Sequence, residues 1–177
     1  MAGHNKWSKI KHKKAVTDAQ KSKLFSKLAR LIASESKKVN GDKEAPGLRA
    51  AIEKARAANM PKDNIEKAIA KGAGANSNPD EEVVYEFYGP AGVAVVVYAL
   101  TDNKNRTTPE IKHILNKKGY ELASPGSALW AFERQGSEFE PKSFVEISEQ
   151  DAEVLKDIIE TLQEHDDVQE IYTNAQQ

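Results

Sequence analysis

The sequence predicts an α+β protein, with an all-α N-terminal domain followed by an α/β sandwich whose mixed or antiparallel sheet carries helices on one face. Two observations support this class. Apolar residues recur at helical spacing up to Gly72, and from Glu81 onward the apolar period becomes that of strands. Between them lies the stretch GAGANSNPD, whose composition is typical of a linker. We therefore expect an all-α domain over residues 1–75, a linker over 76–80 and an α/β domain over 81–177.

Charge divides the chain at the same place, although the formal net charge is only −1. Residues 1–75 hold 18 basic and 7 acidic residues, a net charge of +11. Residues 76–177 hold 8 basic and 20 acidic residues, a net charge of −12. So large a difference favours a polyanionic partner for the first half. The alternative is that the two halves neutralise each other in the fold.

Composition excludes several classes of protein. The chain has no cysteine, so disulfides and thiolate chemistry are excluded. No apolar run approaches the ~20 residues of a membrane span. The N-terminal lysines are not followed by the apolar segment of a secretory signal. We expect a cytoplasmic protein with no membrane partner.

The first fourteen residues, MAGHNKWSKIKHKK, are basic and contain no acid. They have too little apolar surface to fold alone, so they are either a loose tail or an arm that orders on an anion. Lysines bind phosphates, and Trp7 can stack on a base or instead dock on the helices that follow. The candidate nucleic-acid contacts in this arm are His4, Asn5, Lys6, Trp7, Lys9, Lys11, His12, Lys13 and Lys14.

Three helices are predicted in the first half. The first runs from Thr17, which forms a capping box with Gln20, to about Asn40. The second follows a link at 42–46 and is broken at 59–61, and the third runs from Pro61 to Gly72. Basic residues beside the apolar stripe of the first helix extend the candidate nucleic-acid surface, unless they are ordinary solvated side chains. The residues on the first helix are Lys21, Lys23, Lys27, Arg30 and Lys37. Lys62 on the third helix belongs to the same candidate surface.

The second half reads as ββαββαβ. Strands are predicted at 83–88, 93–100, 128–133, 143–147 and 168–172, and the run at 93–100 is apolar enough for a central strand. One helix is expected to start at Thr108-Pro109-Glu110 and stop at Gly119, and another to start at Ser148. The polar loop 101–107 carries Lys104 and Arg106, which are either a secondary nucleic-acid contact or solvated residues.

The sequence offers no recognisable catalytic or metal motif. The histidines lack the HxxxH or HxH spacing of metal ligands, and no nucleophile elbow, Walker loop or kinase motif occurs. His165-Asp166-Asp167 is interpreted as a polar turn. We expect a protein that is not an enzyme and needs no cofactor or metal.

Several motifs are similar to those of the YebC/PmpR family: MAGHNKW, IKHKK, KARAANMPKDNIEKAI, YGPAGVAVVV and TDNKNRT. Members of that family are described as probable transcriptional regulators that bind DNA. A mitochondrial relative activates translation of a cytochrome oxidase subunit, and bacterial members are linked to ribosomes stalled on proline-rich sequences. The resemblance implies an all-α N-terminal domain with α/β domains behind it.

The chain departs from the family pattern at one place. Family members carry a further α/β module after the strand that matches residues 128–134. Here residues 135–141 pass almost directly to the final strand-helix-strand, so we expect the third domain to be missing.

The sequence thus predicts a non-catalytic nucleic-acid-binding regulator of gene expression that binds DNA. The alternative is a ribosome-associated translation factor that binds rRNA through the basic arm. No helix-turn-helix spacing or palindrome-reading dimer is evident, and a monomer is slightly favoured.

Overall fold

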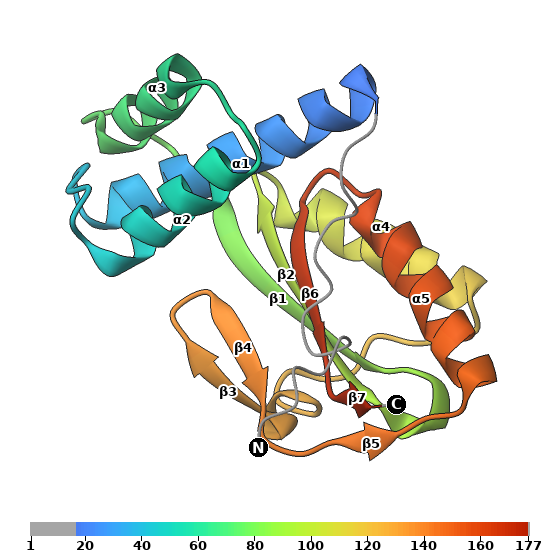
Figure 1. The fold of residues 1–177 in the computed structure, drawn as a ribbon. Helices are drawn as coiled ribbons and strands as arrows, with labels where there is room; N and C mark the ends of the chain where they lie inside the picture. Colours follow the sequence, from blue (N-terminus) through green and yellow to red (C-terminus); the bar gives the residue numbers. More distant parts are fainter. Residues whose placement is uncertain (1–16, 177) are drawn as a thin grey trace. The chain divides into compact units, whose positions relative to one another are not determined.

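The computed structural model describes residues 17–176. These residues form two compact units, a helical one over residues 17–81 and one over residues 82–176 that contains both strands and helices (Figure 1). The predicted α+β class is confirmed.

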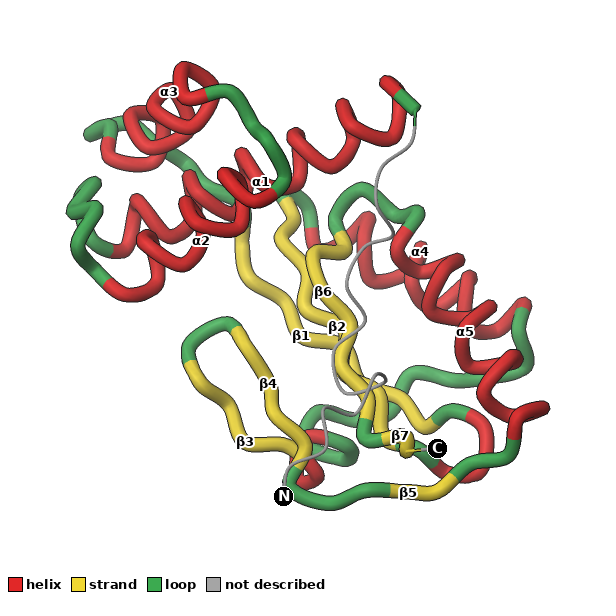
Figure 2. The backbone as a smooth tube through the Cα atoms, viewed as in Figure 1, coloured by secondary structure: helices red, strands yellow, loops and turns green. Residues whose placement is uncertain are grey.

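Three helices make up the first unit: α1 (Asp18–Lys38), α2 (Pro46–Ala57) and α3 (Lys62–Ala73). The predicted capping box is present, because Thr17 Oγ1 accepts the Gln20 N–H at 3.1 Å and the Thr17 N–H donates to Gln20 Oε1 at 3.1 Å. Both α2 and α3 pack on α1 far more than on each other (Figure 2). The longest helix is therefore the common support of this unit.

Gly72 was predicted to end the third helix, and this is wrong, because α3 continues through it to Ala73. A Cβ atom at position 72 would lie 2.2 Å from the carbonyl oxygen of Ala33 and 2.7 Å from Cβ of Ser36. The buried Ser36 hydroxyl also donates to the Ile69 carbonyl at 2.7 Å. A glycine is needed here because the backbones of α1 and α3 approach closely, and not because the helix stops.

A three-stranded sheet in the order β1-β2-β6 forms the frame of the second unit. Its strands are β1 (Glu81–Tyr88), β2 (Ala94–Thr101) and β6 (Val168–Thr173), and β2 pairs with β6 in antiparallel register with Val97 opposite Ile171. A short 3-10 turn, η1 (Pro90–Gly92), joins β1 to β2. All eight residues of β2 are buried, so the predicted central strand is confirmed.

Helices α4 (Lys104–Lys117) and α5 (Glu149–Gln163) lie on one face of this sheet (Figure 1). The core between them is aliphatic and aromatic, and it includes Phe87, Val97, Ile111, Leu155, Ile159 and Ile171. The predicted caps are confirmed where they are local: Ser148 Oγ accepts the Asp151 N–H at 3.1 Å, and Gly119 follows α4 with a φ of 86°.

The start of α4 differs from the prediction. The helix begins at Lys104, with the Asn103 side chain as its cap, so Thr108-Pro109-Glu110 lies inside it. The reason is tertiary. Thr107 Oγ1 donates to the buried Asp167 carboxylate at 2.7 Å and contacts Thr101 Oγ1 at 2.6 Å, which fixes the first turn ahead of the proline.

The predicted strand at 128–133 is also partly wrong. Its first residues form a 3-10 turn, η2 (Leu129–Ala131), and only then does β3 (Phe132–Gln135) begin. Glu86 on β1 is 3% exposed, and its carboxylate accepts the N–H groups of Gly126, Ala128 and Leu129 at 2.7, 2.9 and 2.8 Å. A buried carboxylate requires such donors, and they curl the chain out of the strand conformation.

Residues 135–141, predicted as a connection, include a further strand. β4 (Glu138–Pro141) pairs with β3 as an antiparallel hairpin whose turn contains Gly136 at a φ of 65° (Figure 2). The strand predicted at 143–147 is shorter, β5 (Val145–Glu146), and pairs in parallel with β7 (Ala175–Gln176), which was not predicted.

We predict that Gly72→Ala destabilises the helical unit by roughly 1–3 kcal/mol, the usual cost of overpacking a tight contact. Urea denaturation followed by circular dichroism measures this. The matched control is Gly74→Ala, because a Cβ there would meet only the Ala70 and Lys71 carbonyl oxygens at 3.6 Å. Equal stability of the two variants would contradict the role assigned to Gly72.

We predict that Asp167→Asn destabilises the second unit by roughly 1–3 kcal/mol, because the buried carboxylate accepts from Thr107 and from Arg106 Nη2, each a charge-assisted bond. The control is Asp166→Asn at the neighbouring exposed position. The urea midpoints of both variants measure the loss of stability. A midpoint for Asp167→Asn no lower than that of Asp166→Asn would refute this role for the carboxylate.

Candidate nucleic-acid interface

The predicted interface is only partly within the described residues. The arm residues from His4 to Lys14 lie outside them. The predicted contacts that the structure does place are Lys21, Lys23, Lys27, Arg30, Lys37, Lys62, Lys104 and Arg106.

The basic residues predicted along α1 do not form one exposed stripe. Lys21 and Lys37 are exposed, Lys23 is half-buried and Lys27 is only 4% exposed. Arg30 forms an ion pair with Asp80. The prediction that all of them bind nucleic acid stays a prediction, and the two at the ends of the helix are the most accessible.

The segment after α3, predicted as a linker, is fastened to the helices. Lys37 Nζ donates to the Ser77 carbonyl at 2.9 Å, and Ser77 Oγ donates to the Gly72 carbonyl at 2.8 Å. The Arg30–Asp80 ion pair holds its far end. The segment therefore follows a fixed path beside α1 and α3.

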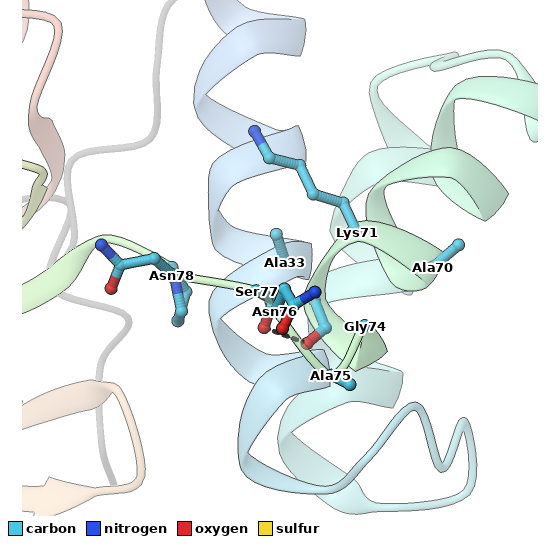
Figure 3. A pocket seen from close by; sticks show the side chains of 10 residues that line it. Ala33, Ala70, Lys71, Gly74, Ala75, Asn76, Ser77 and Asn78 are labelled. Atoms are coloured by element: carbon cyan, nitrogen blue, oxygen red, sulfur yellow. Dashed lines mark hydrogen bonds between the residues drawn. The ribbon is translucent and has the colours of Figure 1, made fainter.

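A pocket of about 480 Å³ opens between this segment, the end of α3 and the middle of α1. Figure 3 shows the residues around it, with the Lys71 ammonium standing apart from the other labelled side chains. Its walls are mainly small or apolar, from Ala33, Ala70, Gly72, Gly74, Ala75 and Pro79. Within residues 17–176, no hydrogen bond or ion pair occupies the side chains of Lys71, Asn76 or Asn78, which also line it.

Sequence reasoning missed Lys71, Asn76 and Asn78. Lys71 resembles any solvated helix lysine, and the asparagines resemble ordinary linker residues. One signal in the sequence could have pointed to these residues. Both asparagines follow the last lysine of the predicted helix within one short, turn-forming stretch.

The exposed residues of α3 add further positive charge. Lys62, a predicted nucleic-acid contact at the first position of the helix, is exposed, and so are Lys67 and Lys71. Of the two acids on this helix, Asp63 and Glu66, the second is partly neutralised: Lys43 Nζ lies 2.8 Å from Glu66 Oε2, and this hydrogen bond holds the pKa of Glu66 below its usual value. Among residues 17–176, Lys67 and Lys71 have no such acidic partner.

In the second unit, the two predicted nucleic-acid contacts, Lys104 and Arg106, differ in their environment. Lys104 is exposed on the first turn of α4. Arg106 Nη2 lies 2.8 Å from Asp167 Oδ2 and 3.0 Å from Asp102 Oδ1, and the hydrogen bond to Asp167 is the main cause that raises the pKa of Arg106. The guanidinium is therefore largely committed to the fold, and Lys104 remains the more available cation.

Glu110, His165 and Asp167 offer ligand atoms within 4.8 Å of one another, so a metal site has to be considered. His165 Nδ1 accepts the Asp167 N–H at 3.1 Å, and Nε2 lies 2.7 Å from Glu110 Oε2. Arg106 already supplies the cation between the two carboxylates. Both imidazole nitrogens are thus engaged, and the cluster is an ion-pair network that joins α4 to the turn before β6.

The connection between α2 and α3 is short. Residues 58–61 join α2 to α3, which is the length of connection that helix-turn-helix motifs use. Both α2 and α3 pack chiefly on α1.

In the part of the chain that the structure describes, no helix is both long and apolar enough to cross a membrane.

Two family profiles match the chain. One, described as the TACO1/YebC protein N-terminal domain, matches residues 5–75. The other, described as the TACO1/YebC second and third domain, matches residues 80–138 and 136–175. A crystal structure of a conserved hypothetical protein from Aquifex aeolicus is similar, with a TM-score of 0.81 and 34% identity over 96% of each chain.

Relatives named probable transcriptional regulatory proteins match nearly the whole chain. The one from Thermosipho africanus is 40% identical over 235 positions, covering 98% of this chain and 93% of the relative. The one from Dictyoglomus thermophilum is 49% identical over 179 positions, covering 99% of this chain and 72% of the relative.

The alignment with the Thermosipho africanus relative is longer than the 177 residues of this chain, so the relative has residues without a counterpart here. The two matched stretches of the second profile meet at 136–138, which is the turn between β3 and β4. The point at which we expect a third domain to be missing coincides with that hairpin turn, and its absence stays a prediction. With both profiles matched and relatives at 40% identity along its length, the chain belongs to the TACO1/YebC family.

Proposed function

We propose that this protein is a non-catalytic regulator of gene expression that acts by binding nucleic acid, with DNA as the first candidate. The name of its relatives, probable transcriptional regulatory protein, supports regulation. The division of charge carries the proposal. A net charge of +11 over residues 1–75 against −12 over the rest directs a polyanion to the N-terminal part of the chain.

The placement of individual cations supports the same surface. Lys21, Lys67 and Lys71 are exposed on α1 and α3 and have no partner among residues 17–176. Lysine ammonium groups of this kind bind backbone phosphates and release counterions. The basic arm, with five lysines and Trp7, would add the largest share of the contact.

A ribosome-associated translation factor that binds rRNA is the second candidate. Its support is the basic arm of residues 1–14, which carries five lysines and one tryptophan. Structured RNA is recognised by shape, by backbone contacts and by stacking on unpaired bases. A basic arm with one tryptophan suits those contacts.

We predict that the full chain binds duplex DNA with an affinity that falls steeply with salt, and that deletion of residues 1–14 reduces the slope of log K against log salt by up to about 4–5, since each phosphate contact contributes about 0.9. Gel-shift titrations from low to physiological salt measure both. No measurable affinity for duplex DNA at physiological salt would exclude duplex DNA as the target.

Co-sedimentation with ribosomes distinguishes the second candidate. We expect the full chain to sediment with ribosomes and the chain lacking residues 1–14 to remain largely in the supernatant. Trp7→Ala is the matched control, because it keeps all five lysines of the arm and removes only the stacking group. Equal sedimentation of the full and shortened chains would refute a role for the arm.

A further inference from the structure

We propose that the pocket formed by α1, α3 and residues 74–79 holds one unpaired nucleotide of the bound nucleic acid. This inference rests on the proposed function and names a site for it. The relevant residues are Ala33, Ala70, Lys71, Asn76, Asn78 and Pro79. The observation that carries it is the juxtaposition of small apolar walls with two amides and one ammonium that have no partner among residues 17–176.

The size and lining of the pocket suit a base. Its volume of about 480 Å³ lies within the range of roughly 300–1,000 Å³ that small-molecule sites occupy. Ala33 on α1, Ala70 on α3 and Pro79 contribute apolar groups to its lining. Gly74 adds no side chain to the lining, and a Cβ atom there would meet only the Ala70 and Lys71 carbonyl oxygens at 3.6 Å, so a planar group can approach this position closely.

In the proposed complex, the asparagine amides contact the base and the Lys71 ammonium contacts the phosphate. The amides of Asn76 and Asn78 each combine donors with an acceptor, as hydrogen bonding to the edge of a base requires. The pocket lies at the carboxyl end of α3, where helix carbonyls favour donors such as the exocyclic amine of a base and disfavour an anion. The phosphate therefore belongs at Lys71, whose ammonium extends away from that helix end (Figure 3).

The segment that carries the asparagines is already held in place. Ser77 lies between Asn76 and Asn78, and it is bound through its carbonyl to Lys37 and through its hydroxyl to the Gly72 carbonyl. These bonds lower the entropy that would be lost when a ligand orders the segment. The amides are consequently presented from a fixed backbone, and among residues 17–176 their side chains have no hydrogen-bond partner.

A pocket of this kind selects single strands. A base within a duplex is paired and stacked, and it reaches a concave site only after it is extruded, which costs a few kcal/mol. The helical unit should therefore bind an unpaired strand more tightly than the corresponding duplex. RNA and DNA share this chemistry, so both strands belong in the test.

The test is fluorescence anisotropy of the full chain with three probes: a labelled 12-nucleotide RNA, DNA of the same sequence and its blunt duplex. We expect Lys71→Gln to weaken binding of the single strands about five- to tenfold. Lys67→Gln is the matched control. It removes the same charge one helical turn from Lys71, at a residue that does not line the pocket. It should cost about twofold.

Asn78→Ala separates the pocket from general electrostatics, because it changes no charge. We expect it to weaken single-strand binding about fivefold and to leave duplex binding unchanged, whereas Asn64→Ala, at an exposed position on α3 outside the pocket, should match the wild type. Urea midpoints verify that the variants are folded.

The outcomes separate the two levels of the proposal. If the full chain binds none of the three probes, the proposed function fails. If it binds them but Lys71→Gln equals Lys67→Gln and Asn78→Ala equals the wild type, the pocket is overturned while nucleic-acid binding stands. Losses that are equal for single strands and duplex would likewise overturn it.

Discussion

The close approach of α1 and α3 at Gly72 determines the rest of the helical unit. A side chain there would collide with the Ala33 carbonyl, so the two backbones meet only because position 72 is glycine. The contact fixes the end of α3, and the Gly72 carbonyl then receives the Ser77 hydroxyl. The path of residues 74–79, and with it the pocket, thus depends on one missing side chain.

Local signals in the sequence predicted what they determine physically. The Thr17 and Ser148 caps and the stop at Gly119 involve partners within a few residues, and all three are present. The apolar run of β2 likewise predicted a central buried strand, because burial on both faces leaves no polar alternation. Periodicity and capping chemistry were sufficient for these features.

Two of the misses have a different cause, which is a buried polar group distant in sequence. Asp167 fixes the start of α4 through Thr107, and Glu86 curls residues 126–129 into a turn. In each case a carboxylate that must be satisfied overrides local propensity. The same limit applied to the candidate site, because nothing near Arg30 or Arg106 in the sequence indicates that Asp80 or Asp167 engages its guanidinium.

The cations of the described residues fall into two groups. Arg30, Arg106 and Arg134, like Lys38, Lys43 and Lys118, pair with acids of their own unit, whereas Lys21, Lys67, Lys71 and Lys104 have no such partner among residues 17–176. The planar guanidinium suits fixed carboxylate pairs, and ammonium groups act as hydrated point charges. The cations left for a polyanion are thus those that contact phosphate without reading sequence, so any selectivity of the helical unit has to come from groups such as the pocket asparagines.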